Sequence, residues 1–150
     1  MHEYTASISW TAEGDFAKGR YSRAHDWSFD GGVTLRASAS PLVVPLPYSD
    51  AAAVDPEEAF VAAVSSCHMM TFLDIIRRKG FVASAYTDDA VGQMIQDGET
   101  WWIARVDLYP KITWVDAPPD ATTLAATHHE AHAACFIANS IKTEVVVNDA

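Results

Sequence analysis

The sequence is short of basic residues. Its 10 lysines and arginines stand against 20 aspartates and glutamates, which gives a formal net charge of −10 at pH 7. Without a basic patch the protein has little with which to neutralise phosphate groups, and this argues against a nucleic-acid-binding role. The same excess of acidic groups argues against attachment to an anionic membrane surface.

The chain is also short of long apolar runs and of cysteine. Arg77 and Arg78 end the longest apolar stretch, so we expect no segment that spans a membrane. The first ten residues, MHEYTASISW, lack the basic and apolar regions of a secretory signal. The sequence therefore predicts a cytoplasmic protein, in which the only two cysteines are free thiols or a redox pair rather than a structural disulfide.

The remaining composition is that of an ordinary globular protein. Of its 150 residues, 49% are hydrophobic and 20% are charged. A chain of this length fits one domain with a sizeable core, so we predict a single domain over residues 1–150.

The N-terminal third is predicted to be β-structure. YTASISW alternates apolar and polar residues, as a half-buried strand does. GRYSRAHDWSF and VTLRASA are predicted to be the next two strands, and the turn signal DGG lies between them. Residues 81–97 and 100–115 are predicted to be two longer strands around QDGET, and IKTEVVV is predicted to be the last strand.

Two helices are expected between these strands. Asp55 and Glu58 have the spacing of a capping box, and the run from Ala59 to Ile76 is apolar nearly all round before it stops at RRKG. Asp120 is predicted to cap a second helix over about 121–137. The predicted order is βββ-α-ββ-α-β. Because the strands come in hairpins, this order indicates an α+β fold with antiparallel sheets around two helices.

Histidines accompany both cysteines. His128, His132 and Cys135 are spaced i, i+4 and i+7, which places them on one face of the second helix. Together with Cys67 and His68 of the first helix, they suggest a soft-ligand site for zinc or copper.

The alternative is a structural role for these side chains. Cysteine is among the most buried residue types, so both thiols are candidates for core filler. His132 would then be a hydrogen-bonded core residue, with His128 and His129 partly solvated, and His68 is expected to point away from the shared face. Since neither C-x-x-C nor H-E-x-x-H occurs, we place this alternative ahead of the metal site.

A reactive thiol at Cys67 would need a nearby cation. The middle of a helix gives a thiol little help from the helix dipole, and burial raises the pKa of a thiol. A guanidinium from the N-terminal sheet would favour the thiolate. The carboxylate of Glu57 is available to hold that guanidinium in place. The candidate arginines, each of which is otherwise a solvated surface charge, are Arg20, Arg23 and Arg36.

Two segments resemble those of the OsmC/Ohr family of thiol-dependent peroxidases. DPEEAFVAAVSSC (residues 55–67) is similar to the family's helix start with its first cysteine, and AHAAC (residues 131–135) is similar to its second-cysteine segment. The order of elements agrees over nearly the whole chain. The resemblance implies an OsmC-like fold and an intertwined homodimer with sites between the subunits.

The resemblance also implies roles for individual residues. Cys67 would attack the peroxide, Cys135 would resolve it as a disulfide, and an Arg–Glu pair would activate Cys67. Glu57 matches the glutamate, and Arg23 is our choice among the three arginines. The implied partners are a small organic hydroperoxide and an external dithiol reductant of lipoyl or thioredoxin type, and no cofactor is implied.

The spacing of Glu57 and Cys67 bears on subunit structure. Ten positions on one helix correspond to about 15 Å along its axis. The two side chains therefore cannot meet within one chain, and a shared site needs Glu57 from a second subunit. A nearly all-apolar helix in a small chain also calls for such a partner.

Three functional hypotheses follow. The leading one is a peroxidase that reduces organic hydroperoxides through Cys67 and Cys135. The second is a non-catalytic metal-binding module that uses His128, His132 and Cys135. The third is an OsmC-like scaffold without catalytic activity that binds a small apolar ligand.

Overall fold

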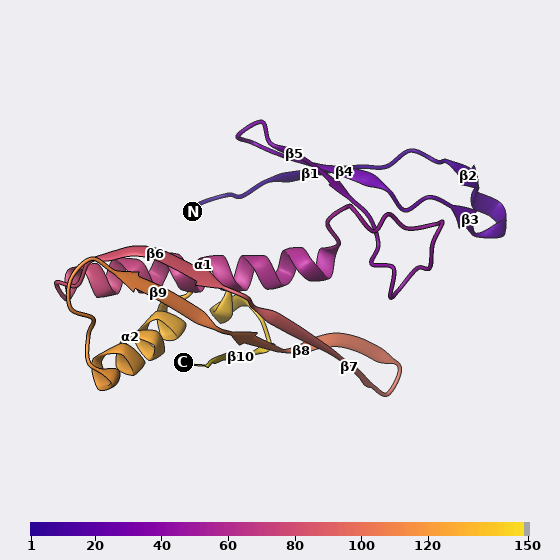
Figure 1. Ribbon diagram of the computed structural model, residues 1–150. Helices are drawn as coiled ribbons and strands as arrows, with labels where there is room; N and C mark the ends of the chain where they lie inside the picture. The colour runs from indigo at the N-terminus through magenta and orange to yellow at the C-terminus, as the bar shows by residue number, and fades with distance from the viewer. Residues whose placement is uncertain (149–150) are drawn as a thin grey trace. The chain divides into compact units, whose positions relative to one another are not determined.

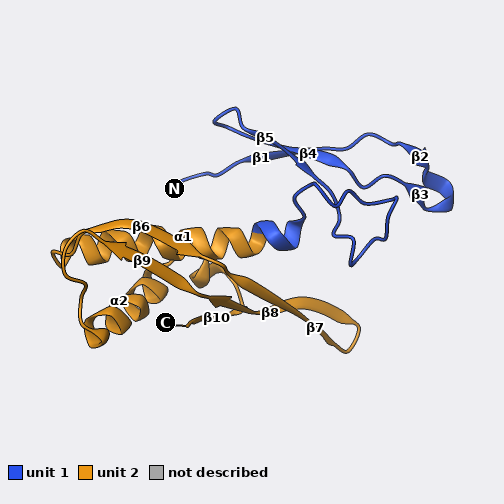
Figure 2. Ribbon diagram, viewed as in Figure 1, with its two compact units in different colours: residues 1–59 blue, residues 60–150 orange. Residues whose placement is uncertain are grey.

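The computed structural model of the protein describes residues 1–148 (Figure 1). The chain divides into two compact units, residues 1–59 and the residues from 60 onward (Figure 2). Each unit has its own sheets. The prediction of one domain over residues 1–150 stays a prediction, because compactness alone does not decide whether a unit folds independently.

The first unit consists of short antiparallel strands. One sheet has the order β1-β4-β5, and a second small sheet pairs β2 with β3. Ala37 is the only buried hydrophobic residue among residues 1–59. The elements are β1 (Ala6–Ser9), β2 (Gly14–Asp15), η1 (Phe16–Lys18), β3 (Arg20–Tyr21), β4 (His25–Phe29) and β5 (Thr34–Ala37).

The second predicted strand is broken where Arg23 lies. The ring Nδ1 of His25 bonds the carbonyl oxygen of Arg23 at 2.7 Å, and Ala24 donates its N–H to the hydroxyl of Ser22. Such local bonds between side chains and backbone replace a strand ladder. The predicted strand therefore becomes β3 and β4, and Arg23 lies in the connection between them.

Helix α1 (Pro56–Arg78) begins and ends as its sequence predicts. Glu58 donates its N–H to the Asp55 carboxylate at 2.8 Å, and Asp55 donates its N–H to the Glu58 carboxylate at 3.3 Å. This reciprocal pair is a capping box. At the other end Gly80 has a φ of +92° and Phe81 donates to the carbonyl of Ile76, which closes the helix in a Schellman motif.

The apolar character of α1 is greater than we expected. By length and composition the helix is able to cross a membrane, so the expectation that Arg77 and Arg78 keep it below that limit is wrong. A core helix of a globular protein passes the same test. In this structure Val64, Phe72 and Ile76 of α1 are at most 1% exposed and belong to the two cores of the second unit.

The second unit packs two sheets and a second helix against one side of α1. One sheet has the order β10-β8-β7, in which β7 and β8 are antiparallel and β10 runs parallel to β8; the other pairs β6 with β9 in antiparallel fashion. The parallel pair departs from the all-antiparallel expectation. The elements are β6 (Ala83–Asp88), β7 (Val91–Asp97), β8 (Thr100–Leu108), β9 (Pro110–Trp114), α2 (Ala121–Ala134), η2 (Ala138–Ser140) and β10 (Glu144–Val147).

The two long strands predicted over 81–97 and 100–115 are four. Figure 1 shows β6 with β9 and β7 with β8 as successive parts of one long hairpin. At the interruption, the carboxylate of Asp88 accepts the backbone N–H of Tyr109 at 2.7 Å, and Pro110 has no N–H to give. The backbone hydrogen bonds of the hairpin are therefore interrupted between β6 and β7 on one arm and between β8 and β9 on the other.

Each part of the hairpin packs on its own core. Phe72, Ile75, Ile76 and Ala131 form one buried cluster, against which side chains of β6 and β9 pack. The other buried cluster consists of Val64, Val106 and Leu108, with partly buried residues from β8 and β10 around it. Helix α1 contributes to both clusters. Together with α2, these features give the α+β architecture with two helices that the sequence predicts.

Candidate functional site: two thiols between α1 and α2

The two cysteines lie side by side although 68 positions separate them. The Sγ atoms of Cys67 and Cys135 are 2.8 Å apart, and both thiols are free. Cys67 lies in the middle of α1 and is half-buried, whereas Cys135 follows the last residue of α2 and is 1% exposed. The structure therefore brings together the two residues that the sequence nominated as the redox pair.

The two sulfurs are not equivalent. Cys135 donates its S–H to the sulfur of Cys67. Burial raises the pKa of the Cys135 thiol, and the hydrogen bond to Cys67 raises it further, although the N–H of Ala138 opposes this effect. Cys135 is thus the thiol that keeps its proton, and Cys67 is the more accessible sulfur and the acceptor.

The end of α2 sets the position of Cys135. We predicted a helix to about residue 137, but α2 ends at Ala134, and Cys135 has extended backbone angles of φ −69° and ψ 118°. Its N–H still bonds the carbonyl of His132 at 3.3 Å, and the next turn directs the N–H of Ala138 to its sulfur at 3.4 Å. The backbone that follows α2, and not the helix itself, therefore contacts the Cys135 sulfur.

His68 and His128 form a second bridge between the same helices. Nε2 of His68 and Nδ1 of His128 are 3.0 Å apart, and the rings stack with an angle of 7° between their planes. The Phe72 ring stacks on the His128 imidazole, with 4.2 Å between the two ring centroids. The expectations that His68 points away and that His128 is partly solvated are wrong, since the two side chains are 1% and 3% exposed.

Burial controls the protonation of this pair. It lowers the pKa of His128 to about 4, although the nearby carboxylate of Asp88 raises it in part. The His128 imidazole is therefore neutral near pH 7. One N–H and one lone pair suffice for the bond to His68, so the pair needs no charge.

The remaining histidines do not complete a metal site. His132 is half-buried, and its Nδ1 is buried without a hydrogen-bond partner in the described part of the chain, contrary to the expectation of a hydrogen-bonded residue. His129 is exposed. Among residues 1–148 no group of three or more His, Cys, Asp or Glu side chains is placed to hold a metal ion. The metal hypothesis for His128, His132 and Cys135 therefore has no geometric support there.

The three candidate arginines belong to the first unit. The guanidinium of Arg23 donates to the carbonyls of Tyr21 and Gly19 at 2.6 and 3.3 Å and lies 3.7 Å from the centroid of the Tyr21 ring. Arg36 pairs with Asp26 at 3.5 Å on an exposed surface. Glu57, also in the first unit, is half-buried in the first turn of α1.

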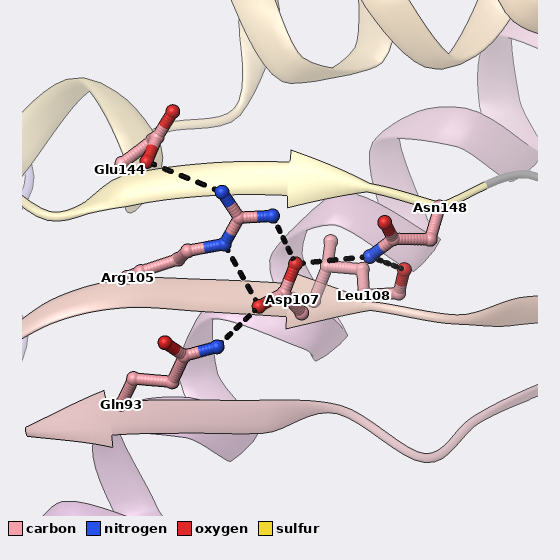
Figure 3. A network of polar contacts seen from close by, with 6 residues as sticks. All are labelled: Gln93, Arg105, Asp107, Leu108, Glu144 and Asn148. Atoms are coloured by element: carbon pink, nitrogen blue, oxygen red, sulfur yellow. Dashed lines mark hydrogen bonds and ion pairs between the residues drawn. The ribbon is translucent and has the colours of Figure 1, made fainter.

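A further polar cluster joins the strands of the second unit (Figure 3). Asp107, only 3% exposed, accepts two hydrogen bonds from Arg105 at 2.9 and 2.7 Å, one from Gln93 at 2.9 Å and one from Asn148 at 3.0 Å. The bonds from Arg105 are the main reason why the pKa of Asp107 falls to about 2. Glu144 pairs with Arg105 from β10. All the partners lie on β7, on β8 or at β10, so the cluster is structural.

Sequence analysis missed the His68–His128 bridge. The available signal was the position of His68 within an apolar helix, where a histidine has to find a buried partner. It also missed Asp88, whose carboxylate accepts the hydroxyl of Ser65 at 2.5 Å, two residues before Cys67. Nothing in the local sequence around Asp88 distinguishes it from a turn aspartate.

Comparison with known proteins agrees with this fold. The family described as OsmC-like protein matches residues 49–148. The chain therefore belongs to the OsmC-like family. No curated protein matches the chain significantly.

Solved structures extend the match to the whole chain. An OsmC-like protein of unknown function from Vibrio cholerae is 45% identical, with 100% of both chains covered and a TM-score of 0.96. An organic hydroperoxide resistance protein from Legionella pneumophila is 18% identical, with 99% and 97% covered and a TM-score of 0.68. The organic hydroperoxide resistance protein OhrB of Bacillus subtilis is 17% identical, with 98% of each chain covered and a TM-score of 0.65. The last two likenesses concern the fold alone.

Proposed function

We propose that the protein is a thiol-dependent peroxidase that reduces organic hydroperoxides at Cys67, with Cys135 as the resolving cysteine. The observation that carries this proposal is the contact of the two free thiols, 2.8 Å between sulfurs, with the accessible one as hydrogen-bond acceptor. A peroxidase of this kind needs one sulfur that the peroxide can reach and a second sulfur held within bonding distance. Two relatives of the same fold are named as organic hydroperoxide resistance proteins, which is consistent with this chemistry.

The first step transfers an oxygen atom to Cys67. The Cys67 thiolate attacks the terminal oxygen of the hydroperoxide, the O–O bond breaks, and the electron pair leaves on the alkoxide. Protonation of the alkoxide gives the alcohol, and Cys67 becomes a sulfenic acid. The hydrogen bond from Cys135 favours the attacking anion, because a donor stabilises a charged acceptor more than a neutral one.

The second step closes the disulfide. The sulfur of Cys135 attacks the Cys67 sulfur, hydroxide departs, and the proton of Cys135 completes a water molecule. An external dithiol of lipoyl or thioredoxin type then reduces the disulfide and is itself oxidised. The sum is hydroperoxide plus dithiol giving alcohol, water and the disulfide of the reductant. No step needs a cofactor.

Activation of Cys67 is assigned to Arg23 and Glu57. The guanidinium would favour the thiolate and polarise the hydroperoxide, and the carboxylate would orient the guanidinium. Arg23 is held by carbonyl oxygens and by the Tyr21 ring, contacts that a guanidinium can exchange for an anionic sulfur. Glu57 and Cys67 belong to one continuous helix and are separated by about 15 Å along its axis. Glu57 would therefore act at the Cys67 of a partner subunit.

The exposed face of the first sheet supports a homodimer. Ile8, Trp27 and Leu35 are register partners across β1, β4 and β5, so their side chains point to the same side. Ile8 and Leu35 are 62% and 39% exposed. A contiguous apolar row on a small sheet with almost no buried core calls for a cover. A second subunit supplies one.

The peroxidase proposal is tested with the reduced protein, tert-butyl hydroperoxide and dihydrolipoamide. We expect peroxide consumption and, without reductant, a Cys67–Cys135 disulfide in mass spectra of a non-reduced digest. Cys67→Ser should abolish consumption, whereas Cys135→Ser should allow one turnover and leave a sulfenic acid that dimedone traps. Consumption that survives Cys67→Ser would overturn the proposal. Thiols that ignore every hydroperoxide would favour the silent ligand-binding scaffold.

Subunit complementation tests the roles of Arg23 and Glu57. Arg23→Lys and Glu57→Gln should each lower the rate of the first step and leave the disulfide chemistry intact. When Glu57→Gln and Cys67→Ser chains are mixed, half of the dimers combine the two variants, and each of these has one intact site if Glu57 acts across subunits. Roughly a quarter of wild-type activity should therefore return. An inactive mixture of verified heterodimers would contradict the shared site.

A further inference from the structure

Side chains of α1 and of the residue that follows it contact α2 at several places. Lys79, directly after α1, contacts Thr127 and Glu130 of α2 at 3.2 and 2.9 Å, and two further pairs start from neighbouring residues in the middle of α1. Cys67 and His68 are neighbours on α1, whereas their partners Cys135 and His128 are seven positions apart on α2. Seven positions correspond to about 10 Å along a helix axis. The two bridges therefore diverge from one place on α1 to two well-separated places along α2.

Two separated attachments restrict a helix more than one attachment does. A helix held at one place can still tilt or rotate about that place, and a second directional contact about 10 Å away along the axis removes much of this freedom. The packing of Phe72 and Ile75 against Ala131 also holds α1 to α2. Apolar packing tolerates small shifts better than a hydrogen bond, which requires both distance and direction.

The thiol chemistry depends on such restriction. A disulfide requires narrow limits of Cα and Cβ separation, and a misplacement of about 1 Å is able to slow a reaction about 100-fold. Cys135 lies at the end of α2, beyond the last helical residue, where the helix itself no longer fixes the side chain. A small tilt of α2 would therefore have a large effect at this sulfur.

We propose that the buried His68–His128 hydrogen bond is the positioning element of the dithiol site, which fixes α2 against α1 so that Cys135 stays within bonding reach of Cys67. The proposal rests on the assigned redox role of the two cysteines, but it does not depend on peroxide as the oxidant. It also gives a role to His68, a residue that neither the attack nor the resolving step uses. His68 and His128 are proposed to act through the position of α2 and are therefore positioning residues.

The readout is the dithiol–disulfide equilibrium of the folded protein. Oxidised dithiothreitol accepts two electrons and two protons from Cys67 and Cys135, forming one protein disulfide and reduced dithiothreitol, so no peroxide is involved. His68→Phe keeps the stacked ring shape and removes the nitrogen, and we expect it to lower the equilibrium constant for disulfide formation about tenfold, or about 30 mV in potential. His68→Gln places an amide nitrogen near the position of Nε2 and should restore most of the constant.

A matched control separates positioning from mere loss of a histidine. His132→Leu removes an imidazole from the same face of α2, closer in sequence to Cys135, and should leave the constant unchanged. Denaturant unfolding of each variant measures stability separately. A lower stability of His68→Phe with an unchanged dithiol equilibrium would assign the bridge a purely structural role and overturn the proposal. Failure of peroxidase activity alone would leave this equilibrium, and hence the proposal, intact.

The wild-type protein provides a second test should the phenylalanine variant fail to fold. Coupling between two interactions is reciprocal, so disulfide formation should strengthen the imidazole bridge by the same factor by which the bridge strengthens the disulfide. Exchange of the shared imidazole proton with solvent, followed by ¹⁵N nuclear magnetic resonance, should be about tenfold slower in the disulfide form. Equal exchange rates in the two forms would overturn the proposal.

Discussion

Cys135 donates a hydrogen bond to Cys67 and is itself almost fully buried, whereas Cys67 is half-buried. Two thiols in contact therefore differ in accessibility and in their role in the hydrogen bond. Burial raises the pKa of Cys135 and the bond to Cys67 adds to this, so the proton is retained on the buried sulfur. This asymmetry decides which sulfur meets a reagent first.

Alkylation should distinguish the two thiols. With limiting iodoacetamide at pH 7 we expect Cys67 to be modified at least about tenfold faster than Cys135, because the thiolate is the reactive form and access is easier at Cys67. Peptide mass spectrometry of a time course measures both rates. In Cys67→Ser, Cys135 should remain slow, and a Cys135 that becomes the faster thiol in the wild type would contradict the assignment.

A side chain at Gly92 should separate β7 from α1. A Cβ built on Gly92 would lie 2.5 Å from a methyl group of Val61, closer than real contacts allow. We expect Gly92→Ala to lower the free energy of unfolding by about 1–3 kcal/mol, as overpacking does. Denaturant unfolding measures the change.

The double variant identifies the cause. Val61→Ala removes the methyl group that the new Cβ would meet, so Gly92→Ala should cost much less in that background. An equal cost in both backgrounds would show that the effect arises from the backbone of β7 and not from contact with α1.

Because of Asp107, the free energy of unfolding should decrease as the pH falls below about 4. The pKa of Asp107 is lowered from 3.8 to about 2, chiefly by the hydrogen bonds from Arg105, so its stabilising effect is complete above pH 4 and is lost as the pH falls toward 2. The difference in stability between the wild type and Asp107→Asn should therefore shrink over this range. Unfolding by urea at pH 6 and pH 2.5 tests this, with Asp97→Asn, an exposed change in β7, as the control.

His128 should act in a different pH range. Burial lowers its pKa from 6.5 to about 4, so the unfolded chain binds a proton that the folded chain does not. Its effect is to reduce stability as the pH falls from about 6.5 to about 4, by about 3 kcal/mol at most. In His128→Asn, this decrease in the free energy of unfolding between about pH 6.5 and pH 4 should be absent. Resonances of the His128 ring that titrate near pH 6.5 in the folded protein would contradict it.

The parts of the fold that obey local rules were predictable from the sequence. The capping box of Asp55 and Glu58, the stop at Gly80 and the cap at Asp120 depend on residues within a few positions, and all three are confirmed. The interruption of the long hairpin was not predictable, because it depends on a bond between Asp88 and Tyr109, 21 positions apart.

The site was predictable only in part, for a similar reason. The pairing of Cys67 with Cys135 came from the family resemblance, since helical periodicity says nothing about which residues of two helices meet. Periodicity placed His68 on the wrong side, because the crossing of α1 and α2, not the spacing within either, brings it to His128. The roles of Arg23 and Glu57 stay predictions.

The interruption at Asp88 and Tyr109 has a consequence for the order in which the second unit loosens. Because β6 with β9 and β7 with β8 are separate ladders over separate cores, their amide protons are expected to exchange with solvent as two groups with different opening free energies. On α1 the two cores are represented by Phe72 and Val64, and Cys67 lies between them. Cys67 thus lies at the boundary between two blocks that we expect to open separately.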